Sequence, residues 1–118
     1  MNWLFVFLGG GLGSLARYGF SLAALRMYSG NFPLGTFISN LLSCVLLVIF
    51  AHCIQMKADS EDWVRPLLVI GFCGGFSTFS TFSNETVQLM TSGNMALAVL
   101  NVLLSMATAL GIIYWFRP

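Results

Sequence analysis

The stretch GFCGGFSTFSTFSNE, residues 71–85, stands inside a longer and mostly apolar segment, residues 64–90, that has the length needed to cross a bilayer. A glycine pair, Gly74 and Gly75, and the run of hydroxyl side chains after it predict a break in the middle of this helix. At bilayer depth, unwound backbone persists only where it is buried in protein or lines a cavity, and its freed carbonyl groups suit a cation. The stretch therefore predicts a membrane-spanning helix that is interrupted at a functional site.

Three other apolar stretches are also long enough to cross a membrane, which takes about 20 residues. They are residues 3–25, 32–54 and 95–116. Of the 118 residues, 58% are hydrophobic and 8% charged, a composition too apolar for an ordinary soluble surface. The linkers carry glycine, proline, asparagine and charged residues typical of turns, and they leave no room for a soluble domain. We therefore predict an all-α membrane protein, a single domain over residues 1–118, with four transmembrane helices and a break in the third.

The basic residues indicate only a weak preference for one orientation in the membrane. With four crossings, both termini and the loop at residues 56–65 lie on the same side. That side holds three basic residues, Lys57, Arg65 and Arg117. The opposite side holds Arg26, with Arg17 placed more deeply behind it in the first helix. This bias is weak, so the chain either inserts one way or inserts both ways and pairs antiparallel about a two-fold axis in the membrane plane. Charge counts leave both open, but a monomer this small has little room for a polar pathway, which favours a dimer.

Each of the four expected helices carries a stripe of polar side chains at helical spacing. The stripes are Ser14, Arg17 and Ser21; Thr36, Asn40 and Ser43; Thr78, Thr81 and Glu85 beside Ser77, Ser80, Asn84 and Gln88; and Asn101, Ser105 and Thr108. A single Ser or Thr in a membrane helix is usually a bridge between helices. Stripes on all four helices, with an arginine and a glutamate among them, favour a hydrated pathway, because ionisable groups in the membrane are costly.

The pathway residues point to a small anion. Phe79 and Phe82 are i, i+3 neighbours beside the hydroxyl run, and the positive edges of aromatic rings can meet an anion without offering a full charge. Packing is the commoner role for such rings, but Arg17 adds positive potential and Asn40 an amide donor. Glu85 would repel an anion, so we expect it at a pore mouth, hydrogen-bonded to Thr81, or protonated in part.

The whole chain resembles the Fluc, or CrcB, family of bacterial fluoride channels. The most specific match is GFCGGFSTFSTFSNE, supported by GGGLGSLARY at residues 9–18 and PLGTFISN at residues 33–40. The resemblance implies an antiparallel dual-topology homodimer with two pores, surrounded by lipid in the bacterial inner membrane. It implies passive efflux of fluoride from the cytoplasm and no nucleic-acid partner.

The resemblance also implies roles for individual residues. Phe79 and Phe82 would form the aromatic box that lines the pores, and Asn40 would be the pore-lining amide of the second helix. The rest of the fluoride pathway would consist of Thr36, Ser80, Thr81, Glu85, Ser105 and, in the vestibule, Arg17. Backbone carbonyl groups of Gly74 and Ser77, given by both subunits, would hold a structural sodium ion at the dimer centre.

Small departures from the family pattern leave the fourth helix's part in the ion path open. Ser77 stands where threonine is frequent, Asn101 where some members have tyrosine, and Ala109 where some continue a line of serines.

Two other functions compete with a fluoride channel. A proton-coupled drug exporter of the small multidrug resistance type has the same size, but it carries its carboxylate in the first helix, where this chain has Arg17. Polar stripes on all four helices argue against a non-transporting assembly subunit. The sequence contains no nucleophile–base pair, metal-ligand cluster or nucleotide motif, so we expect neither an enzyme nor an ATP-driven pump.

Overall fold

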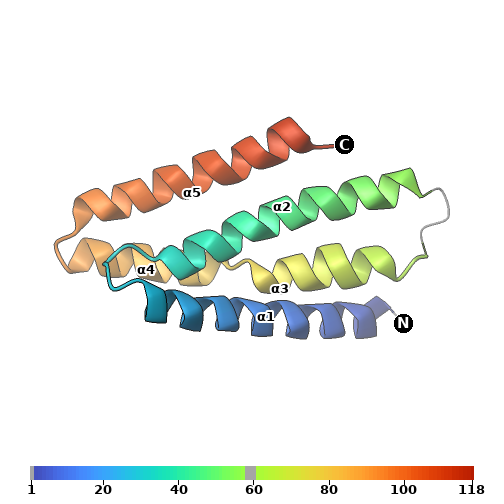
Figure 1. Cartoon of the computed structure of the whole chain (residues 1–118), viewed down its shortest axis with the longest axis horizontal. Coiled ribbons are helices and arrows are strands. Elements are labelled where there is room, and N and C mark those ends of the chain that lie inside the picture. Colours follow the sequence, from blue (N-terminus) through green and yellow to red (C-terminus); the bar gives the residue numbers. More distant parts are fainter. Residues whose placement is uncertain (1, 58–60) are drawn as a thin grey trace.

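The computed structural model describes residues 2–57 and 61–118, and in these residues all regular structure is helical, as predicted. The elements are α1 (Asn2–Met27), α2 (Leu34–Met56), η1 (Arg65–Cys73), α3 (Gly74–Phe76), α4 (Phe79–Thr91) and α5 (Met95–Phe116). They lie lengthwise along one another, with η1, α3 and α4 following each other as one rod (Figure 1). This rod and α2 stand between α1 and α5, since α1 packs on η1, α3 and α2, while α5 packs on α2 and α4. Asp59 of the expected charged loop lies outside the described residues.

Within the described residues, three helical stretches are long and apolar enough to cross a membrane: Leu34–Met56, Arg65–Thr91 and Met95–Phe116. They agree with three of the four predicted spans, and the chain is a multi-pass membrane protein by length and composition. Helix α1 has 26 residues, which gives it a length of about 39 Å and is enough to span. It is less apolar than the other three because its middle and end carry Arg17 and Arg26.

Helix α1 touches η1 backbone to backbone at glycines. A Cβ atom added to Gly9 would overlap the carbonyl oxygen of Leu67, and one added to Gly13 would overlap that of Phe72. Small residues let two membrane helices approach this closely, where packing and not the hydrophobic effect holds them together. The glycines of the first helix therefore mark a close contact between α1 and η1.

We expect Gly13→Ala to lower the thermal stability of the detergent-purified protein. The added methyl group would force α1 away from the Phe72 carbonyl, and overpacking of this kind costs about 1–3 kcal/mol. Gly11→Ala is the matched control, because a Cβ atom at Gly11 meets open space. Equal melting temperatures for the two variants would show that the contact between α1 and η1 is looser than described.

The rod formed by η1, α3 and α4 changes its backbone geometry three times along its length. Its first part, η1, is a nine-residue π-helix that begins with Arg65 and Pro66. After the short α3, Ser77 (φ −86°, ψ 154°) and Thr78 (φ −152°, ψ 123°) are extended. Helix α4 then begins with Thr78 as its N-cap, whose side-chain oxygen accepts a hydrogen bond from the Thr81 amide.

The buried interior of the described chain is small and unusually polar. Its apolar side chains are Val48, Cys73, Phe76, Leu89 and Ala98, and its polar ones are Thr36, Ser39, Ser43 and Asn101. Buried polar groups need hydrogen-bond partners, most of all where no water is at hand. The polar side chains between the helices therefore define where a site can lie.

Candidate functional site

A pocket of about 220 Å³ lies where α2 and α5 face the extended residues between α3 and α4. Its lining residues are Asn40, Cys44, Ser77, Thr78, Phe79, Phe82, Ser105, Met106 and Ala109. We call it the phenylalanine pocket. It brings together four predicted pathway residues, Asn40, Phe79, Phe82 and Ser105, from three helices. Its lining contains hydroxyl side chains, an amide and two aromatic rings, and in the described chain it includes no charged side chain.

The two phenylalanine rings of this pocket stand next to each other on the first turn of α4. Their centroids are 6.0 Å apart and their planes are inclined by 39°. Phe82 is half-buried, whereas Phe79 is 72% exposed in the single chain. One ring is thus held within the bundle, while most of the other projects from it.

The Asn40 side chain of α2 forms two hydrogen bonds with the extended backbone at Thr78. The Thr78 amide donates to Asn40 Oδ1 at 2.9 Å, and Asn40 Nδ2 donates to the Thr78 carbonyl oxygen at 3.4 Å. An extended residue inside a helical rod loses its helical partners, and the carboxamide supplies both a donor and an acceptor in their place. The 3.4 Å bond is long, so the Nδ2 group remains a weakly engaged donor at the pocket wall.

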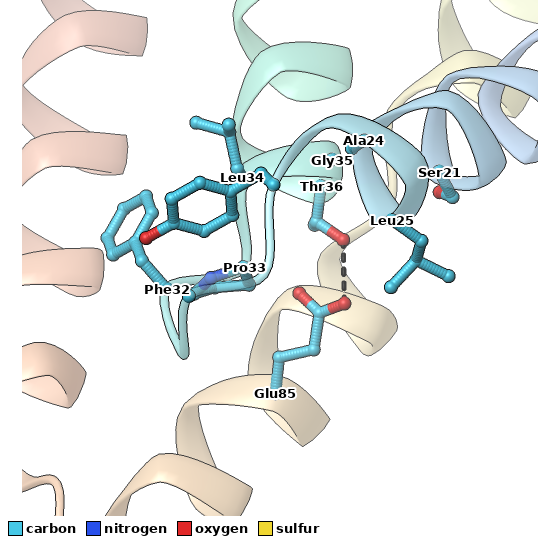
Figure 2. Close-up of a pocket in the computed structure, with 11 residues that line it drawn as sticks. Ser21, Ala24, Leu25, Phe32, Pro33, Leu34, Gly35, Thr36 and Glu85 are labelled. Atoms are coloured by element: carbon cyan, nitrogen blue, oxygen red, sulfur yellow. Dashed lines mark hydrogen bonds between the residues drawn. The ribbon is translucent and has the colours of Figure 1, made fainter.

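A second pocket, of about 160 Å³, lies between α1, α2 and α4. In this carboxylate pocket the Glu85 side chain of α4 rises toward the Thr36 hydroxyl of α2, which donates to Glu85 Oε1 at 2.8 Å (Figure 2). The other carboxylate oxygen, Oε2, is buried without a hydrogen-bond partner among the described residues. A hydrogen bond to Thr81 was one of the three alternatives expected for Glu85; among the described residues the carboxylate bonds to Thr36 instead.

The Arg17 side chain of α1 contacts α3 just before the extended residues Ser77 and Thr78. Its Nε group donates to the Gly75 carbonyl oxygen at 3.2 Å. Carbonyl groups at the end of a helix carry partial negative charge, and a basic side chain there is favourable. Arg17 therefore stabilises the end of α3 and lies in neither pocket.

The carbonyl groups of Gly74 and Ser77 both lose the amide that would bond them in a continuous helix. The Thr78 amide, four residues after Gly74, donates to Asn40, and the Thr81 amide, four residues after Ser77, donates to the Thr78 side chain. Carbonyl oxygens freed in this way are hard ligands that suit a sodium ion. The chemistry of these two groups fits the ion expected from the sequence, although two oxygens are fewer than a cation takes.

The chain matches the family described as CrcB-like protein, Camphor Resistance (CrcB), over residues 4–116. The chain belongs to the CrcB family. Three relatives of the family carry the name Fluoride-specific ion channel FluC. The protein from Phocaeicola vulgatus is 47% identical over 90 residues, which cover 76% of this chain and 74% of the relative. Those from Coxiella burnetii (43% over 108 residues; 91% and 87% covered) and Flavobacterium psychrophilum (37% over 114 residues; 92% of both) are similar over most of their length. The resemblance inferred from the sequence is confirmed.

The remaining predicted pathway residues of this CrcB chain do not share one cavity. Thr36 and Glu85 line the carboxylate pocket. Ser80 is exposed and Thr81 half-buried on α4, and both side chains bond to Thr78 Oγ1, at 3.2 and 3.4 Å. Six of the predicted pathway residues thus line one of two pockets, whereas Arg17, Ser80 and Thr81 line neither.

Two contacts of the site were not foreseen from the sequence. Ser43, 4% exposed, donates to the Cys73 carbonyl oxygen at 3.0 Å and so ties α2 to the end of η1. Thr86 of α4 accepts from Asn101 of α5 at 2.9 Å. Ser43 and Asn101 belong to recognised polar stripes, but Thr86 lies outside the two stripes predicted for α4.

Proposed function

We propose that this CrcB family chain is a fluoride-selective ion channel that lets fluoride leave the cytoplasm passively. The observation that carries the proposal is the phenylalanine pocket, which is lined by Asn40, Ser105 and two phenylalanine rings and by no charged side chain of the described residues. The name of the FluC relatives supports it. Passage through a channel requires no bond-breaking chemistry, so the chain is not an enzyme.

The chemistry of the pocket suits the task of taking fluoride out of water. A selective pore must replace the hydration shell of its ion and still release it, which calls for several moderate donors and no strong trap. The amide of Asn40, the hydroxyl of Ser105 and the ring edges of Phe79 and Phe82 meet this demand.

A second copy of the chain is proposed to cover the outer face of α3 and α4. Ser80, Asn84 and Gln88, at intervals of four residues, are exposed in the single chain, as is most of Phe79. Lipid offers these hydroxyl and carboxamide groups no hydrogen-bond partner, so an exposed stripe of this kind is unfavourable in a bilayer. A homodimer buries the stripe and encloses Phe79.

The distribution of tryptophan supports an antiparallel arrangement of that dimer. Trp3 is the second residue of α1, Trp63 lies two residues before η1 and Trp115 is the last residue but one of α5. The start of α1, the start of η1 and the end of α5 lie at the end of the bundle that holds both termini (Figure 1). Tryptophan is favoured at both membrane–water interfaces. Two chains of opposite orientation place these residues at both, and the weak charge bias allows both insertions.

The extended residues Ser77 and Thr78 are proposed to interrupt the third span inside the membrane, and α1 is proposed to span beside it. The carbonyl groups of Gly74 and Ser77 from both copies would hold a sodium ion. When bound, the ion supplies a fixed positive charge that ties the broken helices together. Because the named relatives come from bacteria, we propose the bacterial inner membrane as the location of this chain.

The proposal is tested by fluoride efflux from liposomes that contain the purified protein and potassium fluoride, with a potassium ionophore to carry the counter-charge. Matched liposomes contain potassium chloride. We expect rapid fluoride release that needs no other ion gradient, and chloride retention. Release of both halides, or of neither, would sink the proposal, and release that requires a proton gradient would favour a proton-coupled exporter.

A further inference from the structure

Asn101 is the most deeply buried polar side chain of α5. It is 1% exposed, and both ends of its carboxamide are engaged. Its Nδ2 group donates to Thr86 Oγ1 of α4 at 2.9 Å, and its Oδ1 atom accepts from the Ser105 hydroxyl at 3.4 Å. Asn101 lines neither the phenylalanine pocket nor the carboxylate pocket, so any effect on the pathway must pass through these partners.

The bonds of Asn101 belong to a chain that begins and ends at the phenylalanine pocket. Thr86 Oγ1 donates onward to the carbonyl oxygen of Phe82 at 2.8 Å. The donors therefore run in one direction, from Ser105 through Asn101 and Thr86 to the backbone of Phe82. Because Ser105 and Phe82 both line the pocket, this chain sets the position of α5 against α4 at the pocket wall.

The first bond of this chain controls what Ser105 offers to an anion. A serine hydroxyl has a single hydrogen, and while it points at Asn101 only lone pairs face the pocket. An O···O distance of 3.4 Å is longer than an ordinary O–H···O bond, whereas the other two links, 2.9 and 2.8 Å, have ordinary lengths. The Ser105 hydrogen can therefore turn toward an ion in the pocket while Asn101 stays held by Thr86.

We propose that Asn101 is a positioning residue of the fluoride pathway, acting through Ser105 and through Thr86 on Phe82. Its carboxamide holds the Ser105 hydroxyl when no ion is beside it, and it keeps the Phe82 backbone at a fixed place on the pocket wall. This inference rests on the proposed function, since it explains how Ser105 and Phe82 are held in place in the same pocket. It accounts for a fully buried amide in a helix whose side chains are mostly exposed in the single chain.

The inference predicts that breaking this series of hydrogen bonds lowers the rate of fluoride efflux without a matching loss of protein stability. Asn101→Leu keeps a side chain of similar size and removes the polar group, so the interior of the membrane protein stays filled. Thr86→Val removes the same link from the other side. We expect each variant to lower the fluoride efflux rate per folded protein by about threefold to tenfold, the equivalent of one hydrogen bond.

The experiment compares these two variants, singly and together, in the fluoride and chloride liposome assay. Thr91→Val is the matched control, because among the described residues the Thr91 hydroxyl bonds only to backbone carbonyls of its own helix, those of Val87 and Gln88. We expect the control to match the wild type. The double variant should be no worse than Asn101→Leu alone, since the two substitutions break one chain.

The ratio of fluoride to chloride efflux separates positioning from mere packing. We expect it to fall in both Asn101→Leu and Thr86→Val, whereas a packing role would lower the melting temperature and leave the ratio unchanged. If the wild type conducts fluoride and the variants show the same efflux rate and the same fluoride-to-chloride ratio, the inference is overturned and the proposed function is not. Additive effects in the double variant would have the same consequence. Wild-type liposomes that retain fluoride would overturn the proposed function and this inference with it. If Asn101→Leu does not fold, Thr86→Val and its control decide the outcome.

Discussion

Phe82→Ile is expected to reduce fluoride efflux by about a hundredfold, the size of loss seen when one group is removed from a charge-stabilising site. Isoleucine keeps the apolar bulk at this position but has no positive ring edge to face the anion. Phe82 is half-buried in the pocket wall, and its ring centroid lies 6.0 Å from that of Phe79. The substitution therefore changes a residue that lines the proposed pathway. The measurement is the initial efflux rate from fluoride-loaded liposomes at equal amounts of folded protein.

Phe37→Ile provides the control for this result. Phe37 forms a ring pair with Phe32 at 5.7 Å, close to the spacing of the pocket pair, but lies outside the phenylalanine pocket. We expect the Phe37 variant to conduct like the wild type and the Phe82 variant to assemble normally. If Phe82→Ile conducts fluoride at the wild-type rate, the Phe82 ring has only a packing role.

Asn40→Asp is the second substitution with a large expected effect. The aspartate is nearly isosteric and keeps an acceptor for the Thr78 amide, so the extended backbone remains held. Its charge, however, faces the pocket that the anion must cross. Like charges ~4 Å apart repel by about 4 kcal/mol at an effective dielectric constant near 20, which lowers fluoride efflux by more than about a hundredfold.

The matched control for Asn40→Asp is Asn94→Asp. Asn94 lies before α5, where its side chain bonds to the Ser92 hydroxyl in an exposed position. The same change of charge at this site should leave efflux near the wild-type rate at neutral pH. If both aspartates reduced flux equally, net charge and not the pocket would control conduction.

Most of the architecture could be predicted because composition and periodicity determine it. The apolar length of α2 and α5 and the glycines that face η1 are local properties, visible in any single stretch of sequence. The closeness of Phe79 and Phe82 follows from their spacing on one helix. The extended backbone at Ser77 and Thr78 occurs where glycines and hydroxyl side chains crowd together.

The hydrogen-bond partners could not be predicted, because they depend on how each helix is rotated against its neighbours. Glu85 could reach Thr81 on its own helix, but the structure pairs it with Thr36 of α2. Asn40 was expected to face the ion, and its bonds to the Thr78 backbone require knowing that the two segments lie opposite each other. Periodicity identifies the polar face of a helix but not which atoms that face will meet.

The direct test of selective, passive fluoride conduction is the reversal potential of the current through the purified protein in a planar bilayer. The two chambers hold a tenfold gradient of fluoride and equal chloride, with a large impermeant anion to balance ionic strength. A fluoride-selective pore predicts reversal near the fluoride equilibrium potential, about 59 mV in magnitude for a single charge. Reversal near zero, or a potential that follows a chloride gradient instead, would contradict fluoride selectivity.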